Sequence, residues 1–288
     1  MNQQGLQGLV AAALTPFDAR DRVQLDGIER LVDYLIRCGV SGLYVCGSTG
    51  EGASLTENER RRVAEAYVQA AAGRVKVIVQ VGHDSLAAAR ALASHAREIG
   101  ADAISATCPT YFPIDRLETL VDCMRYVALG GEGLPFYYYH FPHLTGAAFD
   151  MVDFLDRSAE RIPNLAGLKY TDSRLQEFQQ CLALRKGRFE ILWGRDEMLL
   201  GALATGARGA VGSTYNIATP LYRRIIRAFD EGDLARAQQL QLDAAQMIRT
   251  VAQYPFHSAL KAVMSELGYD CGSCRLPMRS LTTCLLYT

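Results

Sequence analysis

Eight short apolar segments, separated by stretches of helical periodicity, follow one another between residues 8 and 213. Apolar segments of this length, bounded by turn residues, are typical of buried strands. The expected strands cover residues 8–14, 43–46, 75–81, 101–106, 135–140, 165–171, 189–193 and 207–213. Alternation of strands with helices predicts a parallel sheet, and eight evenly spaced units favour closure into a (β/α)8 barrel, a TIM barrel of the α/β class. An open, doubly wound sheet is the alternative architecture.

Helical periodicity fills the gaps between the expected strands and continues alone after Pro220. The expected helices cover residues 25–38, 56–72, 85–100, a segment ending near 129, 149–161, 175–185 and 198–204, followed by 221–229, 234–251 and 256–267. Thr56 with Glu59 has the pattern of a capping box, and Ser85 is placed to open the next helix. We therefore expect a catalytic barrel domain over residues 1–220 and a C-terminal helical extension over residues 221–288.

Charge and hydropathy exclude several classes of partner. The formal net charge is -1 and there is no basic run, so neither nucleic acid nor an anionic membrane surface is expected as a partner. No apolar stretch reaches the length of about 18 residues that a membrane span requires. Residues 1–5 lack the charged and apolar regions of a secretory signal. These features predict a cytoplasmic protein.

The eight cysteines agree with that compartment. Most of them are scattered singly within helical or strand patterns, as is typical of reduced thiols in a cytoplasmic protein. Cys271 and Cys274 form a lone C-x-x-C without a second pair or nearby histidines, so the spacing predicts no metal site. Whether this pair ever oxidises is left open.

Lys169 is the one charged residue in the apolar segment 165–171. Burial disfavours the cationic form of a lysine and lowers its pKa, so a neutral amine becomes accessible near neutral pH. A neutral amine attacks carbonyl carbon, and Schiff-base lysines are made in this way. The alternative is a lysine at a strand end that reaches water or pairs with a carboxylate.

A TIM barrel places its active site at the carboxyl ends of its strands. The candidate site residues at those ends are Ser48, Thr49, Tyr111, Tyr139, Lys169, Thr171, Gly194, Asp196, Glu197 and Ser213. The set holds no histidine cluster and no carboxylates at metal-ligand spacing, so it implies neither a metal nor a cofactor.

Three parts of this set have more than one interpretation. The loop 47–51 could hold a small anion with its backbone N–H groups and hydroxyls, or it could be a generic glycine turn. The Tyr139 hydroxyl could carry a proton, or its ring could belong to the core. Asp196 and Glu197 could accept hydroxyl groups of a polyhydroxylated substrate, or they could cap the following helix.

Four motifs, taken together, resemble the dihydrodipicolinate synthase/N-acetylneuraminate lyase family over nearly the whole chain. They are Gly-Ser-Thr-Gly-Glu at 47–51, Tyr-His-Phe-Pro at 139–142, Gly-Leu-Lys-Tyr-Thr at 167–171 and Gly-Ala-Val-Gly-Ser at 209–213. Within that family, residues 137–140 and 194–197 are most similar to the lyase members. The resemblance implies class I aldolase chemistry, with Lys169 forming a Schiff base with the keto carbon of pyruvate or of a sialic acid.

The resemblance also implies roles for the other candidates. Ser48 and Thr49 match the residues that bind the pyruvate carboxylate, and Tyr139 matches the residue that transfers a proton. The positions that match those holding the sugar chain are Thr171, Gly194, Asp196, Glu197 and Ser213. Tyr111 matches a tyrosine that reaches into the site of a neighbouring subunit, which implies a homotetramer.

Leu144 departs from part of this family. Dihydrodipicolinate synthases have an arginine at this position, five residues after the strand-five tyrosine, and leucine cannot replace its bidentate fork. The implied reaction is therefore cleavage of N-acetylneuraminate to pyruvate and N-acetylmannosamine, with a small keto-acid sugar as substrate. The alternatives are a 2-keto-3-deoxy sugar acid aldolase, a dihydrodipicolinate synthase, or a non-catalytic keto-acid sensor that would need neither Lys169 nor Tyr139.

Overall fold

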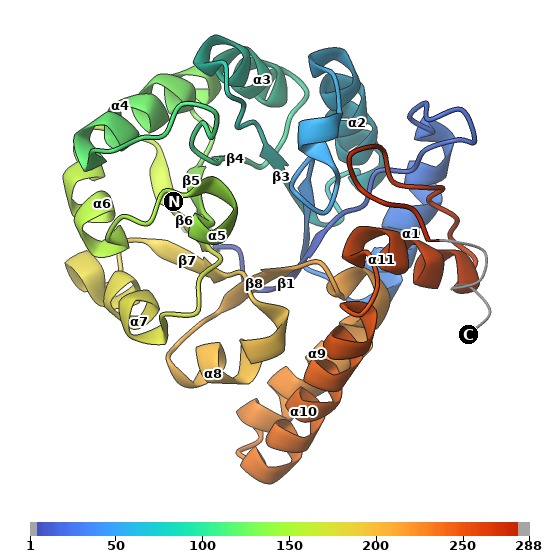
Figure 1. Ribbon diagram of the computed structural model, residues 1–288. Coiled ribbons are helices and arrows are strands. Elements are labelled where there is room, and N and C mark those ends of the chain that lie inside the picture. The colour runs from blue at the N-terminus through green and yellow to red at the C-terminus, as the bar shows by residue number, and fades with distance from the viewer. Residues whose placement is uncertain (1–4, 282–288) are drawn as a thin grey trace.

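The eight expected strands form a closed parallel barrel in chain order (Figure 1). The structure is a computed structural model that describes residues 5–281. Its strands are β1 (Gly8–Ala12), β2 (Gly42–Val45), β3 (Lys76–Gln80), β4 (Ala103–Ala106), β5 (Phe136–His140), β6 (Leu165–Tyr170), β7 (Glu190–Trp193) and β8 (Gly209–Gly212). β8 pairs with β1 and closes the ring, so the TIM barrel is confirmed and the open sheet is wrong.

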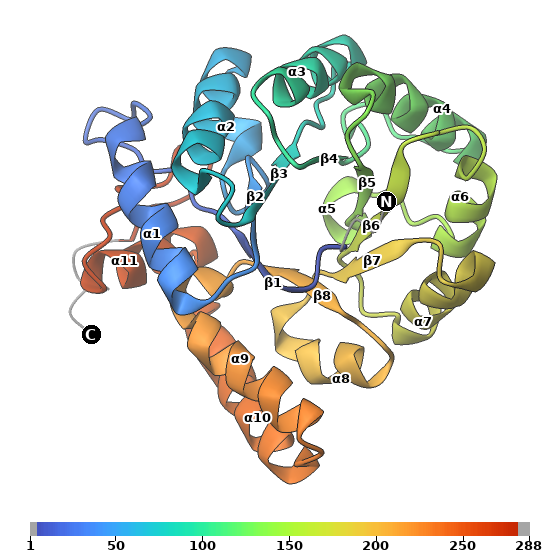
Figure 2. The same cartoon turned by 180° about the vertical axis from the view of Figure 1, so that it is seen from behind.

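Helices surround the barrel on the outside (Figures 1 and 2). They are α1 (Ile28–Cys38), α2 (Glu57–Ala71), α3 (Leu86–Glu98), α4 (Leu117–Ala128), α5 (Pro142–Thr145), α6 (Met151–Ser158), α7 (Leu175–Ala183), α8 (Leu199–Ala204), α9 (Tyr215–Asp230), α10 (Leu234–Val251) and α11 (Phe256–Glu266). α10 packs along α9, and α11 lies near α1 in both views. The Thr56–Glu59 capping box is confirmed, and the Ser85 hydroxyl accepts a hydrogen bond from the Ala88 N–H at the start of α3.

Helix α9 begins earlier than the sequence pattern predicts. It starts at Tyr215 and includes Pro220, whereas we expected a helix only from residue 221. The helix is interrupted at Ala218, which has the non-helical dihedrals φ -140° and ψ 24°. Proline is tolerated close to such a break because its missing N–H falls where a new helical segment starts. The expected boundary at residue 220 lies inside α9, and the division into two domains stays a prediction.

The boundaries of other elements also differ from the expected ones. β1 ends at Ala12, although the apolar residues continue to Leu14. Ala13 and Leu14 are buried in the loop that follows the strand. The short helix α5, which starts with Pro142 at its first turn, was not expected. Residues 1–4, on which the expectation of no secretory signal partly rests, and residues 282–288 lie outside the described part of the chain. Within residues 5–281, no helix has the length and apolar character needed to cross a membrane.

The barrel has an inner and an outer apolar layer because side chains alternate along each strand. On β5, Tyr137 and Tyr139 belong to the inner cluster, whereas Tyr138 packs in the outer layer against the helices. β6 alternates in the same way, since Leu168 and Tyr170 belong to the outer cluster. This alternation directs the intervening Lys169 into the barrel.

Candidate active site

Lys169 and Tyr139 are register partners on the adjacent parallel strands β6 and β5. The Lys169 Nζ atom lies 3.8 Å from the centroid of the Tyr139 ring and 3.9 Å from that of Tyr44 on β2. The lysine is 4% exposed. Burial lowers the pKa of Lys169 to about 7, while the negative charge of Asp196 opposes that change. A large fraction of the amine is therefore neutral near pH 7, as a nucleophilic lysine requires.

A second buried lysine shows how Lys169 differs from a structural one. Lys261 on α11 is 2% exposed, and its Nζ lies 2.6 Å from the Glu51 Oε1 atom. Lys76 is exposed and pairs with Asp102. Lys169 neither reaches solvent nor forms an ion pair with any carboxylate in residues 5–281. The interpretation of Lys169 as a strand-end lysine that snorkels or pairs is therefore wrong.

Tyr139 is buried with its hydroxyl in a polar environment. Burial raises the pKa of Tyr139 to about 12, and the neighbouring hydroxyls of Ser48 and Thr171 act against that rise. The phenol consequently keeps its proton near neutral pH. Phe141 stacks on the Tyr139 ring with 5.7 Å between centroids and fixes its orientation. A protonated phenol held beside a neutral amine and two hydroxyls can donate or relay a proton.

The loop 47–51 meets the end of β8 through its side chains. The Thr49 Oγ1 and Ser213 Oγ atoms lie 2.6 Å apart. Glu51 has a left-handed backbone, with φ 56°, and its buried carboxylate pairs with Lys261. The Arg275 N–H donates to the other Glu51 oxygen at 2.9 Å. The loop is thus held in one conformation by segments more than 200 residues away in the chain. A generic glycine turn would not need such contacts.

Asp196 follows β7 and is tied to the first residues after β8. Its Oδ2 atom accepts hydrogen bonds from the Thr214 N–H at 2.8 Å and the Thr214 hydroxyl at 2.6 Å. Burial raises the pKa of Asp196 to about 6, and the Thr214 hydrogen bonds oppose the rise. A Cβ atom at Gly212 would lie 2.2 Å from Asp196 Oδ1, so only glycine leaves room for this carboxylate.

Neither acidic residue acts as a side-chain cap of the following helix. The carboxylate of Asp196 accepts hydrogen bonds from Thr214. Glu197 pairs with the Arg195 guanidinium, whose Nε lies 3.0 Å from Glu197 Oε1. Gly194, at the end of β7, faces Thr171: a Cβ atom there would lie 2.1 Å from the Thr171 hydroxyl oxygen. Glycine at this position allows the two strand ends to approach.

A cavity of about 310 Å³ joins these groups. Nine of the ten candidate residues line it: Ser48, Thr49, Tyr139, Lys169, Thr171, Gly194, Asp196, Glu197 and Ser213. The tenth, Tyr111, does not line the cavity of its own chain. It is 77% exposed and packs edge-to-face on the exposed Phe112, with 5.0 Å between ring centroids. The structure therefore brings together all the candidates except Tyr111.

The sequence interpretation missed other residues that line the cavity. They are Ala12, Phe141, His143, Arg195, Val211, Thr214, Ile248, Phe256 and His257. Arg195 and Thr214 follow the seventh and eighth expected strands beside candidate residues, but neither was assigned a role from the sequence. Ile248, Phe256 and His257 come from α10 and the start of α11, whose approach to the barrel mouth depends on tertiary packing and has no local sequence signal. Burial lowers the pKa of His257, so this wall of the cavity carries a neutral imidazole.

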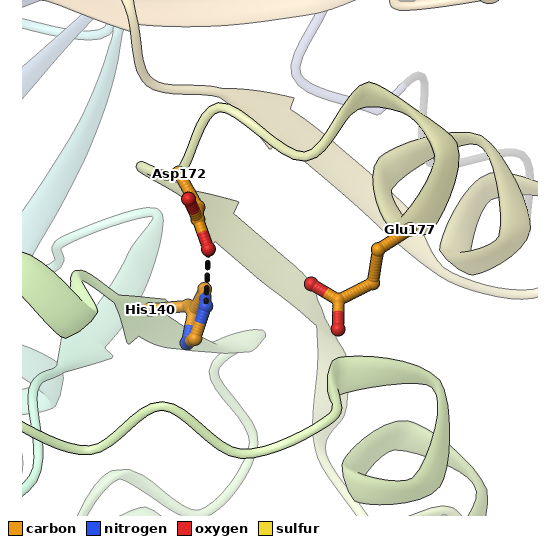
Figure 3. Close-up of side chains that lie close together, drawn as sticks. All are labelled: His140, Asp172 and Glu177. Atoms are coloured by element: carbon orange, nitrogen blue, oxygen red, sulfur yellow. Dashed lines mark ion pairs between the residues drawn. The ribbon is translucent and has the colours of Figure 1, made fainter.

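A separate polar cluster lies on the outer side of β5 and β6 (Figure 3). His140, Asp172 and Glu177 each offer one nitrogen or oxygen atom that could bind a metal ion, and these three atoms lie within 4.8 Å of one another. Arg174 already joins the two carboxylates, with Nε 2.8 Å from Asp172 Oδ2 and Nη2 3.1 Å from Glu177 Oε2. Burial lowers the pKa of His140 to about 4, so the imidazole is neutral. Because the guanidinium supplies the positive charge, the cluster is best explained as a structural ion-pair network.

Comparison with known proteins finds N-acetylneuraminate lyases both by sequence and by structure. The model of the dihydrodipicolinate synthetase family matches residues 5–285. N-acetylneuraminate lyase A of Xenopus laevis is 40% identical over 279 residues, which cover 96% of this chain and 91% of the relative. The solved N-acetylneuraminate lyase of Proteus mirabilis has a TM-score of 0.95 and 38% identity, covering 98% of this chain and 95% of that one. A Ruminococcus gnavus sialic acid aldolase, solved as a catalytic lysine mutant, has a TM-score of 0.93 and 25% identity, covering 98% and 92%.

Proposed function

The chain belongs to the dihydrodipicolinate synthetase family, and on that premise we propose that it is a class I aldolase that cleaves N-acetylneuraminate to pyruvate and N-acetylmannosamine. The observation that carries this proposal is the buried, unpaired amine of Lys169 beside Tyr139 in a cavity lined by hydroxyls and carboxylates. Related lyases of similar length and a relative with a catalytic lysine support it.

The reaction starts with attack of the neutral Lys169 amine on the keto carbon of the substrate. Loss of water gives an iminium, which accepts the electron pair of the breaking C–C bond and becomes an enamine. The substrate hydroxyl loses its proton as the aldehyde product forms, and Tyr139 is placed to carry this proton. Protonation of the enamine carbon and hydrolysis release pyruvate and return the free amine. The iminium that Lys169 forms with the substrate is the electron sink, so this chemistry calls for no cofactor.

The cavity holds polar groups for both parts of such a substrate. Ser48 and Thr49 present hydroxyls and backbone N–H groups to the pyruvate carboxylate. The groups assigned to the polyhydroxylated chain are Thr171, Gly194, Asp196, Glu197 and Ser213. Carboxylates accept several hydroxyl donors at once, which fits a sugar chain better than a second carboxylate.

The same groups argue against a dihydrodipicolinate synthase activity. Aspartate semialdehyde would bring a carboxylate to a site that already holds Asp196 and Glu197. Leu144, at the position where the synthases have an arginine, is 58% exposed and cannot pair with an anion. A pure keto-acid sensor would need neither the depressed pKa of Lys169 nor Tyr139.

A homotetramer in the cytoplasm completes the proposal. Tyr111 and Phe112 form an aromatic pair in which both residues are more than 75% exposed, which fits a tyrosine that enters a neighbouring subunit's site. The cysteines within residues 5–281 are all free, which fits a reducing compartment. Light scattering coupled to size exclusion should give the mass of four chains, and Tyr111→Ala should lower activity if the tyrosine serves a partner's site. A monomeric active enzyme would contradict this assignment.

The substrate is tested by measuring pyruvate release from N-acetylneuraminate and from a panel of 2-keto-3-deoxy sugar acids. Condensation of pyruvate with aspartate semialdehyde is measured on the same preparation. We expect N-acetylneuraminate to give the highest kcat/KM. Robust condensation with aspartate semialdehyde, or faster cleavage of another sugar acid, would overturn the substrate assignment and leave the pyruvate half of the mechanism standing.

A further inference from the structure

Behind Asp196, two buried side chains, Thr214 and Tyr222, form a chain of hydrogen bonds that leads away from the cavity. The Thr214 hydroxyl donates to Asp196 Oδ2 at 2.6 Å, and the Thr214 Oγ1 atom lies 2.6 Å from the Tyr222 hydroxyl on α9. Thr214 and Tyr222 are 1% and 0% exposed, so water does not compete for these bonds. Tyr222 thus connects helix α9 to a carboxylate in the cavity without itself lining it.

The direction of the chain follows from the protons available. An ionised carboxylate can only accept, so Thr214 gives its single hydroxyl proton to Asp196. The Tyr222 hydroxyl must then donate to Thr214 Oγ1. All the donors point toward Asp196, which stabilises its ionised form and leaves the second oxygen, Oδ1, without a hydrogen-bond donor in residues 5–281. Oδ1 is therefore the oxygen available to a substrate hydroxyl.

We propose that Tyr222, acting through Thr214, is a positioning residue that holds Asp196 ionised and oriented to accept a hydroxyl of the sugar chain. This inference rests on the proposed function, because it assigns Asp196 to the sugar end of the substrate. It adds to the recognition of that end a determinant on α9, a helix none of whose residues lines the cavity.

Other charged and titratable groups face Asp196 and are left unchanged by the test. Glu197 is its neighbour in the chain, Lys169 faces it from β6, and Tyr139 from β5. α9 contributes Tyr215 and Tyr222. Lys169 favours the ionised carboxylate and Glu197 disfavours it, so a change confined to Tyr222 isolates the contribution of the hydrogen-bond chain.

Tyr215 offers a matched control for Tyr222. Both tyrosines are buried on α9, and their rings meet edge-to-face with 4.7 Å between centroids. The Tyr215 hydroxyl has no hydrogen-bond partner within the described residues. Tyr222→Phe and Tyr215→Phe therefore remove the same atom from neighbouring buried sites, and only the first change interrupts the chain to Asp196.

The test is the pH profile of kcat/KM for N-acetylneuraminate, measured for wild type and both variants. For Tyr222→Phe we expect the acid limb to move to higher pH and kcat/KM at pH 6 to fall about three- to tenfold, the equivalent of one neutral hydrogen bond. Tyr215→Phe should follow the wild-type profile. The rate of borohydride trapping with pyruvate, which does not involve the sugar end, should be the same in all three proteins.

The positioning role would be overturned if the two variants had the same pH profile. It would also be overturned if Tyr222→Phe lowered the rate of pyruvate trapping as much as it lowered kcat/KM. If Tyr222→Phe does not fold, Thr214→Ser and Thr214→Val provide the same comparison: the acid limb should move less in the serine variant, which keeps the hydroxyl. A similar shift in both would also overturn the proposal. Failure of the wild-type protein to cleave N-acetylneuraminate would instead refute the proposed function, so the two failures are distinguishable.

Discussion

The Nζ atom of Lys169 lies 3.8 Å from the centroid of the Tyr139 ring, and the two residues are register partners on β6 and β5. The Tyr139 ring and the Tyr44 ring, whose centroid lies 3.9 Å from Nζ, contribute to the burial of the amine. The same arrangement places the amine next to the Tyr139 phenol, which stays protonated because burial raises its pKa to about 12. A nucleophile and a proton carrier are thus produced by adjacent strands of one sheet.

Tyr139→Phe should separate proton transfer from Schiff-base formation. The substitution keeps the ring beside Lys169 and removes only the hydroxyl. We expect kcat for cleavage to fall by roughly 10²–10⁴, the usual contribution of a positioned acid–base group, while the pyruvate adduct still forms. Stopped assays of pyruvate release give kcat, and mass spectrometry after borohydride gives the adduct. A kcat near that of wild type would return Tyr139 to a packing role.

Schiff-base formation should depend on pH through the state of Lys169. Burial lowers the pKa of its amine to about 7, and the protonated amine below that pH is not a nucleophile. The initial rate of pyruvate trapping should therefore rise as the pH increases through about 7, level off above it, and fall about tenfold per pH unit in the acid limit. A midpoint near 10, the ordinary value for lysine, would show that the amine is not desolvated as described.

Asp196→Ala should affect the sugar end far more than the pyruvate end. Charge-assisted hydrogen bonds are worth about 1.5–3 kcal/mol each, so kcat/KM for N-acetylneuraminate should fall roughly ten- to a hundredfold. Borohydride trapping of pyruvate should survive, because the keto acid is held by the loop 47–51. Equal losses in both assays would show that Asp196 supports the whole site, contrary to its assignment to the sugar chain.

Lys261→Met should destabilise the protein and disturb the loop 47–51. Removal of one member of a buried ion pair leaves the other charge uncompensated, which costs about 3–5 kcal/mol of unfolding free energy. Here Glu51 is the group left unpaired. Chemical denaturation measures this loss, and the double variant Glu51→Gln with Lys261→Met is the control that should recover part of it. Equal stability of wild type and Lys261→Met would mean that the pair does not hold the loop.

Much of the barrel was predictable because strand burial leaves a periodic apolar pattern in the sequence. The carboxyl ends of the strands meet at one end of any such barrel, so Lys169, Tyr139 and Asp196 could be grouped before the structure was known. The prediction that Tyr111 belongs to the site is not met within one chain, because its side chain points to solvent. Its assignment to a neighbouring subunit stays a prediction.

Contacts between distant segments could not be predicted in the same way. The Glu51–Lys261 pair joins residues 210 positions apart, and the chain from Tyr222 to Asp196 depends on how α9 packs against the end of β8. The early start of α9 at Tyr215 was hidden by Pro220, since proline more often ends a helix than lies within one. Each of these features depends on tertiary packing and leaves no local periodicity.

The central claim is that Lys169 alone among the four lysines of the chain carries the reactive amine. The direct measurement is incubation with pyruvate and borohydride, followed by digestion and mapping of the adduct by mass spectrometry. We predict a single reduced pyruvyl adduct on Lys169, and no adduct or turnover in Lys169→Ala or in Lys169→Arg, whose guanidinium stays protonated. An adduct on Lys76, Lys186 or Lys261, or turnover by Lys169→Ala, would contradict the account.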